Sequence, residues 1–380
     1  MADPIATIFH VTDMHLCVEP DGGTRKNKRL LSRMLVAGAE HAWPQGAREF
    51  LGKAMWHREP ALERLGPALR QLSEQEASAS PGAPIVVLQG GDVEALGSWA
   101  PDGLVEYEAF PSFDFVHKRL RPDDERTEWL DIFGNHDTWP GRHPVPPPSG
   151  LAQINRVRIG TVPGLVGPWP DCQVLGVGEQ VPLVIARVNT VAREADGEAF
   201  AYGVPSEHPP NGEDLSYVLD QLEAELGPWQ HQRAVRAVLL HHPIHYAREL
   251  ADRHGPNRLM GADELAACLR DLRVQLVIAG HVHALDPPAS AVGLEAGCQE
   301  PLEYPTVQLV AETPTQDWPP RGNRGNTNAD LPTRSFCRYR LLAQGETFDI
   351  ERTVFRWNDN EGEFMPVGGS PRVFRGIRLG

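Results

Sequence analysis

Short apolar runs, separated by helical patterns, constrain the fold of this chain more than any other feature of its sequence. Most of the runs consist of β-branched and aliphatic residues without clean alternation, which is typical of strands buried on both faces. They occupy residues 5–11, 85–88, 129–133, 183–188, 237–240 and 274–279. The runs therefore predict the central strands of a layered protein.

Amphipathic helical patterns lie between these predicted strands. Residues 60–72, 213–226 and 263–272 each gather their apolar side chains on one helical face. Pro60 suits the first turn of a helix, and Gly227 suits a helix end. Because strands and helices alternate, the sequence predicts an α/β fold, and periodicity alone favours a doubly wound sheet.

The C-terminal part of the chain follows a different pattern. Residues 334–342 and 347–357 read as two strands joined by a tight turn, and the first shows the alternation of a half-buried antiparallel strand. We interpret residues 1–357 as a single domain that ends in this strand pair. Within it, residues 17–80 form an inserted, variable helical region, and residues 358–380 are interpreted as a C-terminal tail.

Composition excludes several classes of protein. The 380 residues carry a formal net charge of -15, which argues against binding nucleic acid through its phosphates. The five cysteines include no CxxC pair, so neither a zinc knuckle nor a disulfide framework is indicated. The chain shows no signal-peptide pattern and no apolar run near the ~18 residues that a membrane span needs. We therefore expect a soluble, cytoplasmic protein that does not associate with membranes.

Five of the apolar runs end in side chains that bind metals or transfer protons. Loops at the carboxyl ends of strands gather at one edge of an open α/β sheet, so we expect these clusters to converge. The clusters are Asp13-Met14-His15, Gly91-Asp92, Gly134-Asn135-His136-Asp137, His241-His242-Pro243 and Gly280-His281-Val282-His283. Carboxylate, amide and imidazole groups suit Mn, Fe or Zn, and these are too many for one ion. The sequence therefore predicts two metal ions that share a carboxylate.

Local geometry offers a reason for two of these patterns. Along an extended segment alternate side chains point the same way, so Asp13 and His15 are expected to reach one ion while Met14 turns into the protein. Glycines that precede Asp92, Asn135 and His281 permit tight turns and a close approach of the backbone. A lone histidine such as His10 is interpreted as structural.

In this order the five clusters resemble the calcineurin-like metallophosphoesterase superfamily, from residue 13 to residue 283. Each cluster alone is a weak signal, but GNHD and GHVH together are specific. The resemblance implies a four-layer αββα sandwich of two mixed β-sheets flanked by helices, with a dinuclear metal site at the strand ends. That architecture replaces the doubly wound sheet that periodicity favours.

The resemblance also implies a role for each matching residue. One ion would be held by Asp13, His15 and His283, the other by Asn135, His241 and His281, with Asp92 bridging the two. The resemblance selects His241 because the family's ligand stands two residues before the proline, and His242 would line the pocket or point away. His136 would face the phosphate and leaving group of the substrate, with Asp137 orienting it.

The implied activity is phosphoester hydrolysis by a hydroxide that bridges two divalent or mixed-valence ions of Mn, Fe or Zn. Val93 follows Asp92 and no tyrosine stands nearby, which argues against an iron–tyrosine centre. We expect a phosphodiesterase for small molecules, the class that includes cyclic nucleotide enzymes, with the Pro-rich loop 140–150 at the pocket rim. The alternatives are a phosphomonoesterase, a DNA nuclease and, lacking activity, a protein-binding scaffold.

Overall fold

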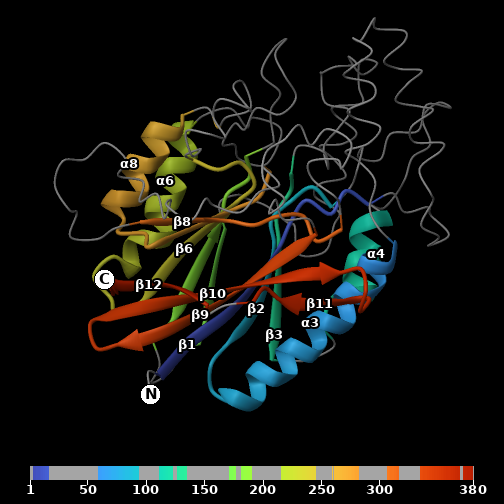
Figure 1. Ribbon diagram of the computed structural model, residues 1–380. Coiled ribbons are helices and arrows are strands. Elements are labelled where there is room, and N and C mark those ends of the chain that lie inside the picture. Colours follow the sequence, from blue (N-terminus) through green and yellow to red (C-terminus); the bar gives the residue numbers. More distant parts are fainter. Residues whose placement is uncertain are drawn as a thin grey trace, which may run out of the picture.

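Two β-sheets with helices on their outer faces make up the computed structural model of this chain (Figure 1). The structure describes residues 3–16, 59–93, 111–122, 126–134, 171–176, 181–190, 215–244, 259, 261–281, 306–315, 334–368 and 371–379.

The first sheet has seven strands and mixes parallel with antiparallel pairing. Its order is β11-β10-β9-β1-β2-β3, and β12 also pairs with β10. Strands β1, β2 and β3 run parallel, whereas β9 to β12 are joined by antiparallel pairs. The strands are β1 (Asp3–Val11), β2 (Ile85–Gln89), β3 (Thr127–Asp131), β9 (Ser335–Gln344), β10 (Thr347–Asn358), β11 (Glu363–Pro366) and β12 (Arg372–Arg378).

The second sheet has five strands in the order β4-β5-β6-β7-β8. All pairs are parallel except the one between β4 and β5 at the edge. The strands are β4 (Asp171–Leu175), β5 (Leu183–Arg187), β6 (Val235–Leu240), β7 (Leu276–Ala279) and β8 (Val307–Val310). Strands β5 to β8 are buried at every position, which explains their continuous apolar sequences.

Helices cover the outer face of each sheet, as Figure 1 shows. Helices α3 (Glu59–Ala79) and α4 (Pro111–Arg119) flank the first sheet. Helices α6 (Leu215–Leu226) and α8 (Ala262–Asp271) flank the second, and the short 3-10 helix η1 (Gly227–Trp229) follows α6. Within the described residues, no helix combines the length and the apolar character needed to cross a membrane.

Three separate cores identify four layers. One core lies between the two sheets, one between the first sheet and α3 with α4, and one between the second sheet and α6 with α8. The four-layer sandwich is therefore confirmed, and the doubly wound sheet suggested by periodicity is wrong. An apolar strand has the same sequence whether its second face meets a helix or another sheet, so periodicity cannot separate the two folds.

Two strands near the C-terminus had no clear signal in the sequence. Residues 358–380, interpreted above as a tail, contribute β11 and β12, which both pair with β10. Few positions of β11 and β12 are buried, so their sequences show no apolar periodicity.

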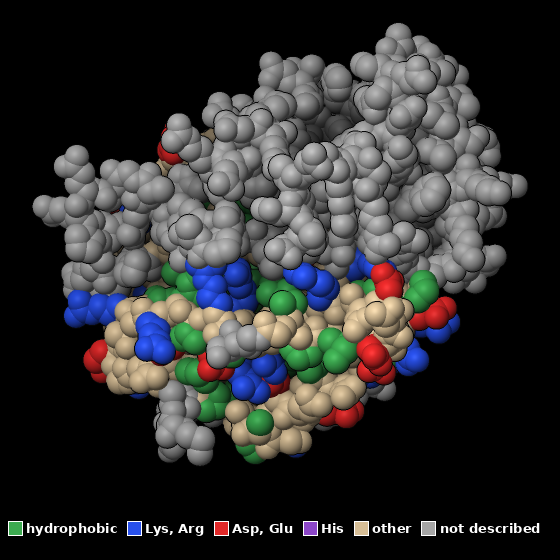
Figure 2. All heavy atoms as spheres, viewed as in Figure 1, with side chains coloured by type: hydrophobic (Ala, Val, Ile, Leu, Met, Phe, Trp, Pro, Cys, Tyr) green, Lys and Arg blue, Asp and Glu red, His purple; other side chains and the backbone are tan. Residues whose placement is uncertain are grey.

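The face seen in Figure 2 has no uniform character. Basic, acidic and hydrophobic side chains are mixed on its described part.

Candidate metal centre

The loops that leave β1 and β2 run side by side beyond the ends of the strands. The amide of Asp13 donates to the Gly91 carbonyl (2.9 Å), and the amide of His15 donates to the Asp92 carbonyl (2.9 Å). A third bond, from Leu16 to Val93, continues the ladder (2.6 Å). The main chain thus places the first predicted cluster directly beside the second.

Four of the predicted ligands have left-handed backbone. Their φ angles are 55° for Asp13, 47° for His15, 53° for Asp92 and 71° for His281. Among the described residues only two other non-glycine residues, Arg273 and Arg334, have positive φ. This conformation is uncommon outside glycine, and the surrounding structure must hold it in place. In known proteins such strained residues cluster at active sites and ligand-binding sites.

The same angles correct the expected reason for the orientation of Asp13 and His15. Strand β1 ends at Val11, so the Asp13–His15 segment is not extended and simple alternation does not apply. Met14 is nevertheless fully buried, within the core beside α3 and α4. The left-handed turns at Asp13 and His15, rather than a strand, direct both side chains toward Asp92.

Asp92 lies between two histidines that come from different sheets. Its Oδ2 atom is 3.7 Å from His15 Nε2 and 3.4 Å from His241 Nε2. Two ligands bonded to one tetrahedral ion at 2.0–2.2 Å lie about 3.4 Å apart. One oxygen of Asp92 can therefore share an ion with each histidine, which is the position that a bridging carboxylate requires.

The ring of His241 is fixed by its other nitrogen. Nδ1 lies 2.7 Å from the Gly90 carbonyl, and since a carbonyl only accepts, Nδ1 donates and Nε2 is directed toward Asp92. Burial lowers the pKa of His241, but the charges of Asp92 and Asp13 and the bond to Gly90 outweigh it and raise the pKa to about 9. The two carboxylates thus make this position favourable for a positive charge.

Asp13 joins the ends of β1 and β7. Its two carboxylate oxygens accept from the amide of His281 at 3.1 and 3.0 Å, and Oδ2 also accepts from Thr12 Oγ1 at 2.6 Å. Carboxylate and imidazole atoms of Asp13, Asp92 and His241 all lie within 4.8 Å of one another. These groups offer the charge, the ligand types and the spacing that a divalent ion needs.

His242 belongs to a second group of possible ligands. One ring nitrogen each of His241, His242 and His281 fall within 4.8 Å of one another. The rings of His242 and His281 are 4.4 Å apart, and His242 Nδ1 lies 2.9 Å from Thr190 Oγ1. His242 is fully buried. Its side chain lies among the other histidines, on the side of the proposed second ion.

The structure brings together five of the predicted ligands: Asp13, His15, Asp92, His241 and His281. The other predicted site residues lie outside the described residues, namely Asn135, His136, Asp137 and His283, as does the loop 140–150. Sequence reasoning missed Thr12, Thr190 and the Gly90 carbonyl, which hold Asp13, His242 and His241. Their roles depend on contacts between loops, which no local sequence pattern predicts.

Comparison with known families identifies the chain. The family model of calcineurin-like phosphoesterases matches residues 6–285, a span that contains all five clusters. The chain belongs to this family. Metal-dependent phosphoester hydrolysis and a dinuclear metal site are characteristic of the calcineurin-like phosphoesterases, and the donor set described above fits such a site.

Solved structures resemble this chain at low sequence identity. A purple acid phosphatase from yellow lupin shares 14% identity with a TM-score of 0.50, over 98% of this chain and 54% of that chain. A putative 5'-nucleotidase from Staphylococcus aureus shares 14% identity with a TM-score of 0.39, over the same shares of the two chains. This chain thus spans about half the length of both proteins. A search of curated protein sequences finds no match.

Separate substitutions of the two adjacent histidines distinguish their roles at the candidate metal centre. We expect His241→Ala to remove about half of the bound metal, because His241 would be lost from an ion that Asp92 shares. We expect His242→Ala to retain both ions, with metal affinity reduced about 10- to 100-fold, the usual cost of losing a group that supports a ligand. Elemental analysis of the purified variants measures the difference, and the reverse result would assign the ligand to His242.

His10, interpreted from the sequence as structural, lies fully buried on β1. Neither of its ring nitrogens has a hydrogen-bond partner among the described residues. Burial lowers the pKa of His10 from 6.5 to about 4, although the charge of Asp13 partly offsets the effect. His10 is therefore neutral in the folded protein at neutral pH.

Replacing His10 tests its effect on acid stability. An unfolded chain binds a proton at His10 below pH 6.5, whereas the folded chain resists until about pH 4. The contribution of neutral His10 to the free energy of unfolding is therefore fully present above pH 6.5. As the pH falls, this contribution is lost, by about 2 kcal/mol between pH 7 and pH 5. We expect His10→Leu to remove that loss. Chemical denaturation at both pH values measures it, and an unchanged pH dependence would contradict the assignment.

Proposed function

We propose that this chain is a metal-dependent hydrolase of small-molecule phosphodiesters. The observation that carries the proposal is the place of Asp92 Oδ2, 3.7 Å from His15 Nε2 and 3.4 Å from His241 Nε2. A carboxylate so placed can serve two ions at once, and two-ion sites are suited to displacement at phosphorus. The formal net charge of -15 favours a small substrate over a nucleic acid.

The proposed ligands divide between two ions. Asp13, His15 and His283 would hold one, Asn135, His241 and His281 the other, and Asp92 both. When bound, the ions would stabilise charge on the phosphoryl oxygens and lower the pKa of a shared water. The chain's own contribution is orientation: the Gly90 carbonyl fixes His241, and Thr12 with the His281 amide fixes Asp13.

His136 is the proposed proton donor to the leaving group, with Asp137 orienting its ring. We expect His136→Asn to lower turnover about 100-fold, since a positioned acid contributes roughly 10²–10⁴-fold. Metal content should stay unchanged, because His136 is not among the proposed ligands. Turnover of an aryl phosphodiester and elemental analysis of the same sample check both statements, and unchanged turnover would rule out the role.

A substrate panel in the presence of Mn²⁺ tests the proposed function. The panel contains a bis-aryl phosphodiester, an aryl phosphomonoester, cyclic nucleotides and single-stranded DNA. We expect the diesters to be hydrolysed fastest. A strong preference for the monoester would make the protein a phosphomonoesterase, and a preference for DNA would make it a nuclease. No hydrolysis of any substrate with Mn, Fe or Zn would favour a binding scaffold.

A further inference from the structure

The segment that follows β8 lies against the loop that carries Asp13 and His15. Strand β8 ends at Val310, and residues 311–315 after it are all buried. Thr315 Oγ1 donates to the Met14 carbonyl at 2.7 Å. This hydrogen bond joins the two sheets, because β8 belongs to the second sheet and Met14 follows β1 of the first. It reaches the candidate metal centre from a segment that contributes no proposed ligand.

The peptide that joins Met14 to His15 is held on both sides. Its amide, that of His15, donates to the Asp92 carbonyl at 2.9 Å, and its carbonyl, that of Met14, accepts from Thr315. A trans peptide is planar, and its amide and carbonyl point to opposite sides, so two such bonds fix the plane. The φ angle of His15, which is 47°, is a rotation about the next bond of the chain. The fixed plane therefore helps to hold the left-handed conformation of His15.

Thr315 is itself held in place by its own segment. The Thr313 carbonyl accepts from the Ser335 amide at 3.0 Å, and Ser335 Oγ donates to the buried Glu312 carboxylate. The Thr315 amide donates to Thr313 Oγ1 at 3.4 Å. These contacts place the Thr315 hydroxyl at the metal-site loop without help from an ion.

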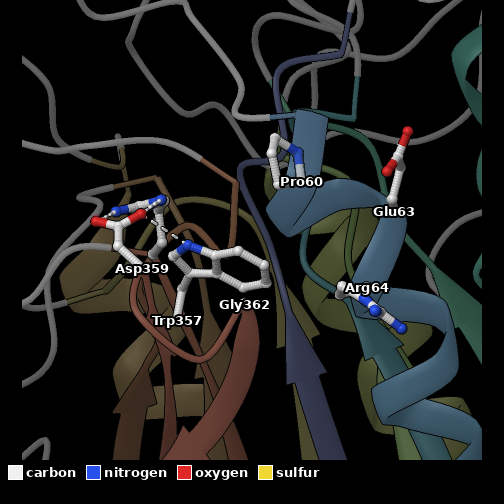
Figure 3. Close-up of a pocket in the computed structure, with 7 residues that line it drawn as sticks. Pro60, Glu63, Arg64, Trp357, Asp359 and Gly362 are labelled. Atoms are coloured by element: carbon white, nitrogen blue, oxygen red, sulfur yellow. Dashed lines mark hydrogen bonds and ion pairs between the residues drawn. The ribbon is translucent and has the colours of Figure 1, made fainter.

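The start of β9 anchors this segment to the C-terminal hairpin. Arg334, which precedes Ser335, accepts at its carbonyl from the Trp357 amide at 2.9 Å and donates to the Asp359 carboxylate at 3.0 and 2.7 Å. Trp357 and Asp359 stand side by side in Figure 3, on the hairpin side of a pocket that α3 lines from the other side. Hydrogen bonds thus connect the hairpin, through Arg334 and Ser335, with the segment that carries Thr315.

Burial makes the bond between Thr315 and Met14 hard to replace. Both residues are fully buried, so solvent water does not reach the Met14 carbonyl. A buried carbonyl that loses its donor carries the full cost of desolvation, or its peptide turns to find another donor. Turning the peptide would change the direction of His15, the residue next in the chain.

We propose that Thr315 is a positioning residue of the metal centre. Its hydroxyl orients the peptide between Met14 and His15, and through it the His15 imidazole that faces Asp92. The inference rests on the ligand set of the proposed function, in which His15 holds one of the ions. Thr315 acts through His15 and is not a ligand.

Calorimetric titration of the metal-free full chain with Mn²⁺ tests the proposal. Thr315→Val keeps the shape of the side chain and removes the donor. We expect it to weaken Mn²⁺ binding about 10- to 100-fold, the usual cost of losing a group that supports a ligand. Thr315→Ser keeps the hydroxyl and should bind Mn²⁺ like the wild type. In a His15→Ala background, Thr315→Val should change the affinity by less than about threefold, because the residue that Thr315 positions is gone.

Thr306 offers a matched control at the opposite end of β8. Thr306 Oγ1 donates to the Val274 carbonyl at 2.6 Å, and Thr306 is also fully buried. Thr306→Val therefore removes the same kind of hydrogen bond from the same strand, far from the proposed ligands. We expect chemical denaturation of the metal-free proteins to show a similar loss of stability in Thr306→Val and Thr315→Val. Only Thr315→Val should bind Mn²⁺ more weakly.

Several results would overturn the proposal: wild-type Mn²⁺ affinity in Thr315→Val, an equal loss in Thr306→Val or Thr315→Ser, or a full further loss in the His15→Ala background. Activity separates this inference from the proposed function. If Mn²⁺ binding depends on Thr315 but the wild type hydrolyses no diester, the positioning role stands and the proposed function fails. If the wild type hydrolyses diesters and Thr315→Val binds Mn²⁺ normally, the function stands and the positioning role fails.

Discussion

Replacing Asp92 with asparagine is expected to lower phosphodiester turnover by about 10³-fold. Asparagine keeps the size of the side chain but removes the charge, and its amide oxygen cannot serve two cations as a carboxylate does. Loss of a single neutral hydrogen-bond donor that stabilises the transition state lowers turnover by about 10²–10³-fold. A ligand shared by two ions should have an effect at the upper end of this range, because its loss weakens both. In the proposed site, the position between His15 and His241 makes Asp92 the residue on which both ions would depend.

Metal content and stability separate this effect from misfolding. We expect Asp92→Asn to lose at least one of two bound ions by elemental analysis, while the metal-free protein unfolds at nearly the wild-type temperature. Asp220→Asn, on the exposed face of α6, makes the same chemical change outside the site and should alter neither quantity. Full metal occupancy in Asp92→Asn, with turnover within tenfold of wild type, would contradict a bridging role.

The convergence of the ligands could be predicted from the sequence because it depends on strand direction. Each cluster follows an apolar run, and parallel strands bring their carboxyl ends to one edge. Asp13 and Asp92 follow neighbouring strands, and His241 and His281 follow the neighbouring pair β6 and β7. Direct contact between clusters from the two sheets, such as that of Asp92 with His241, also required the family's architecture.

Features that depend on contacts distant in sequence could not be predicted. Asp13 and His15 have left-handed backbone in a loop that donates hydrogen bonds to the carbonyls of residues 91–93. Their own conformational preferences do not predict it. Helix α3 contacts strand β11, which lies almost 300 residues away along the chain. No local pattern in either segment indicates the other.

Replacing Gly280 with alanine is the second change with a large expected effect. A Cβ atom at this position would lie 2.7 Å from Asp13 Oδ2 and 3.0 Å from the Gly90 carbonyl oxygen, and it would overlap Thr12 Oγ1. Gly280 does not have positive φ, so alanine can adopt its backbone conformation and the effect comes from space alone. The methyl group must displace Thr12 Oγ1 and the Asp13 carboxylate to which it donates, and Asp13 in turn accepts from the neighbouring His281 amide.

We expect Gly280→Ala to bind less metal, to lose about 10³-fold in turnover, and to unfold with a free energy about 1–3 kcal/mol below wild type. Gly227→Ala is the matched control, because a Cβ there meets no atom within 4 Å and the backbone is not left-handed. That variant should keep wild-type turnover and stability. Elemental analysis, kinetics and chemical denaturation measure the three quantities. Normal metal content and turnover in Gly280→Ala would contradict the role of Asp13 as a metal ligand.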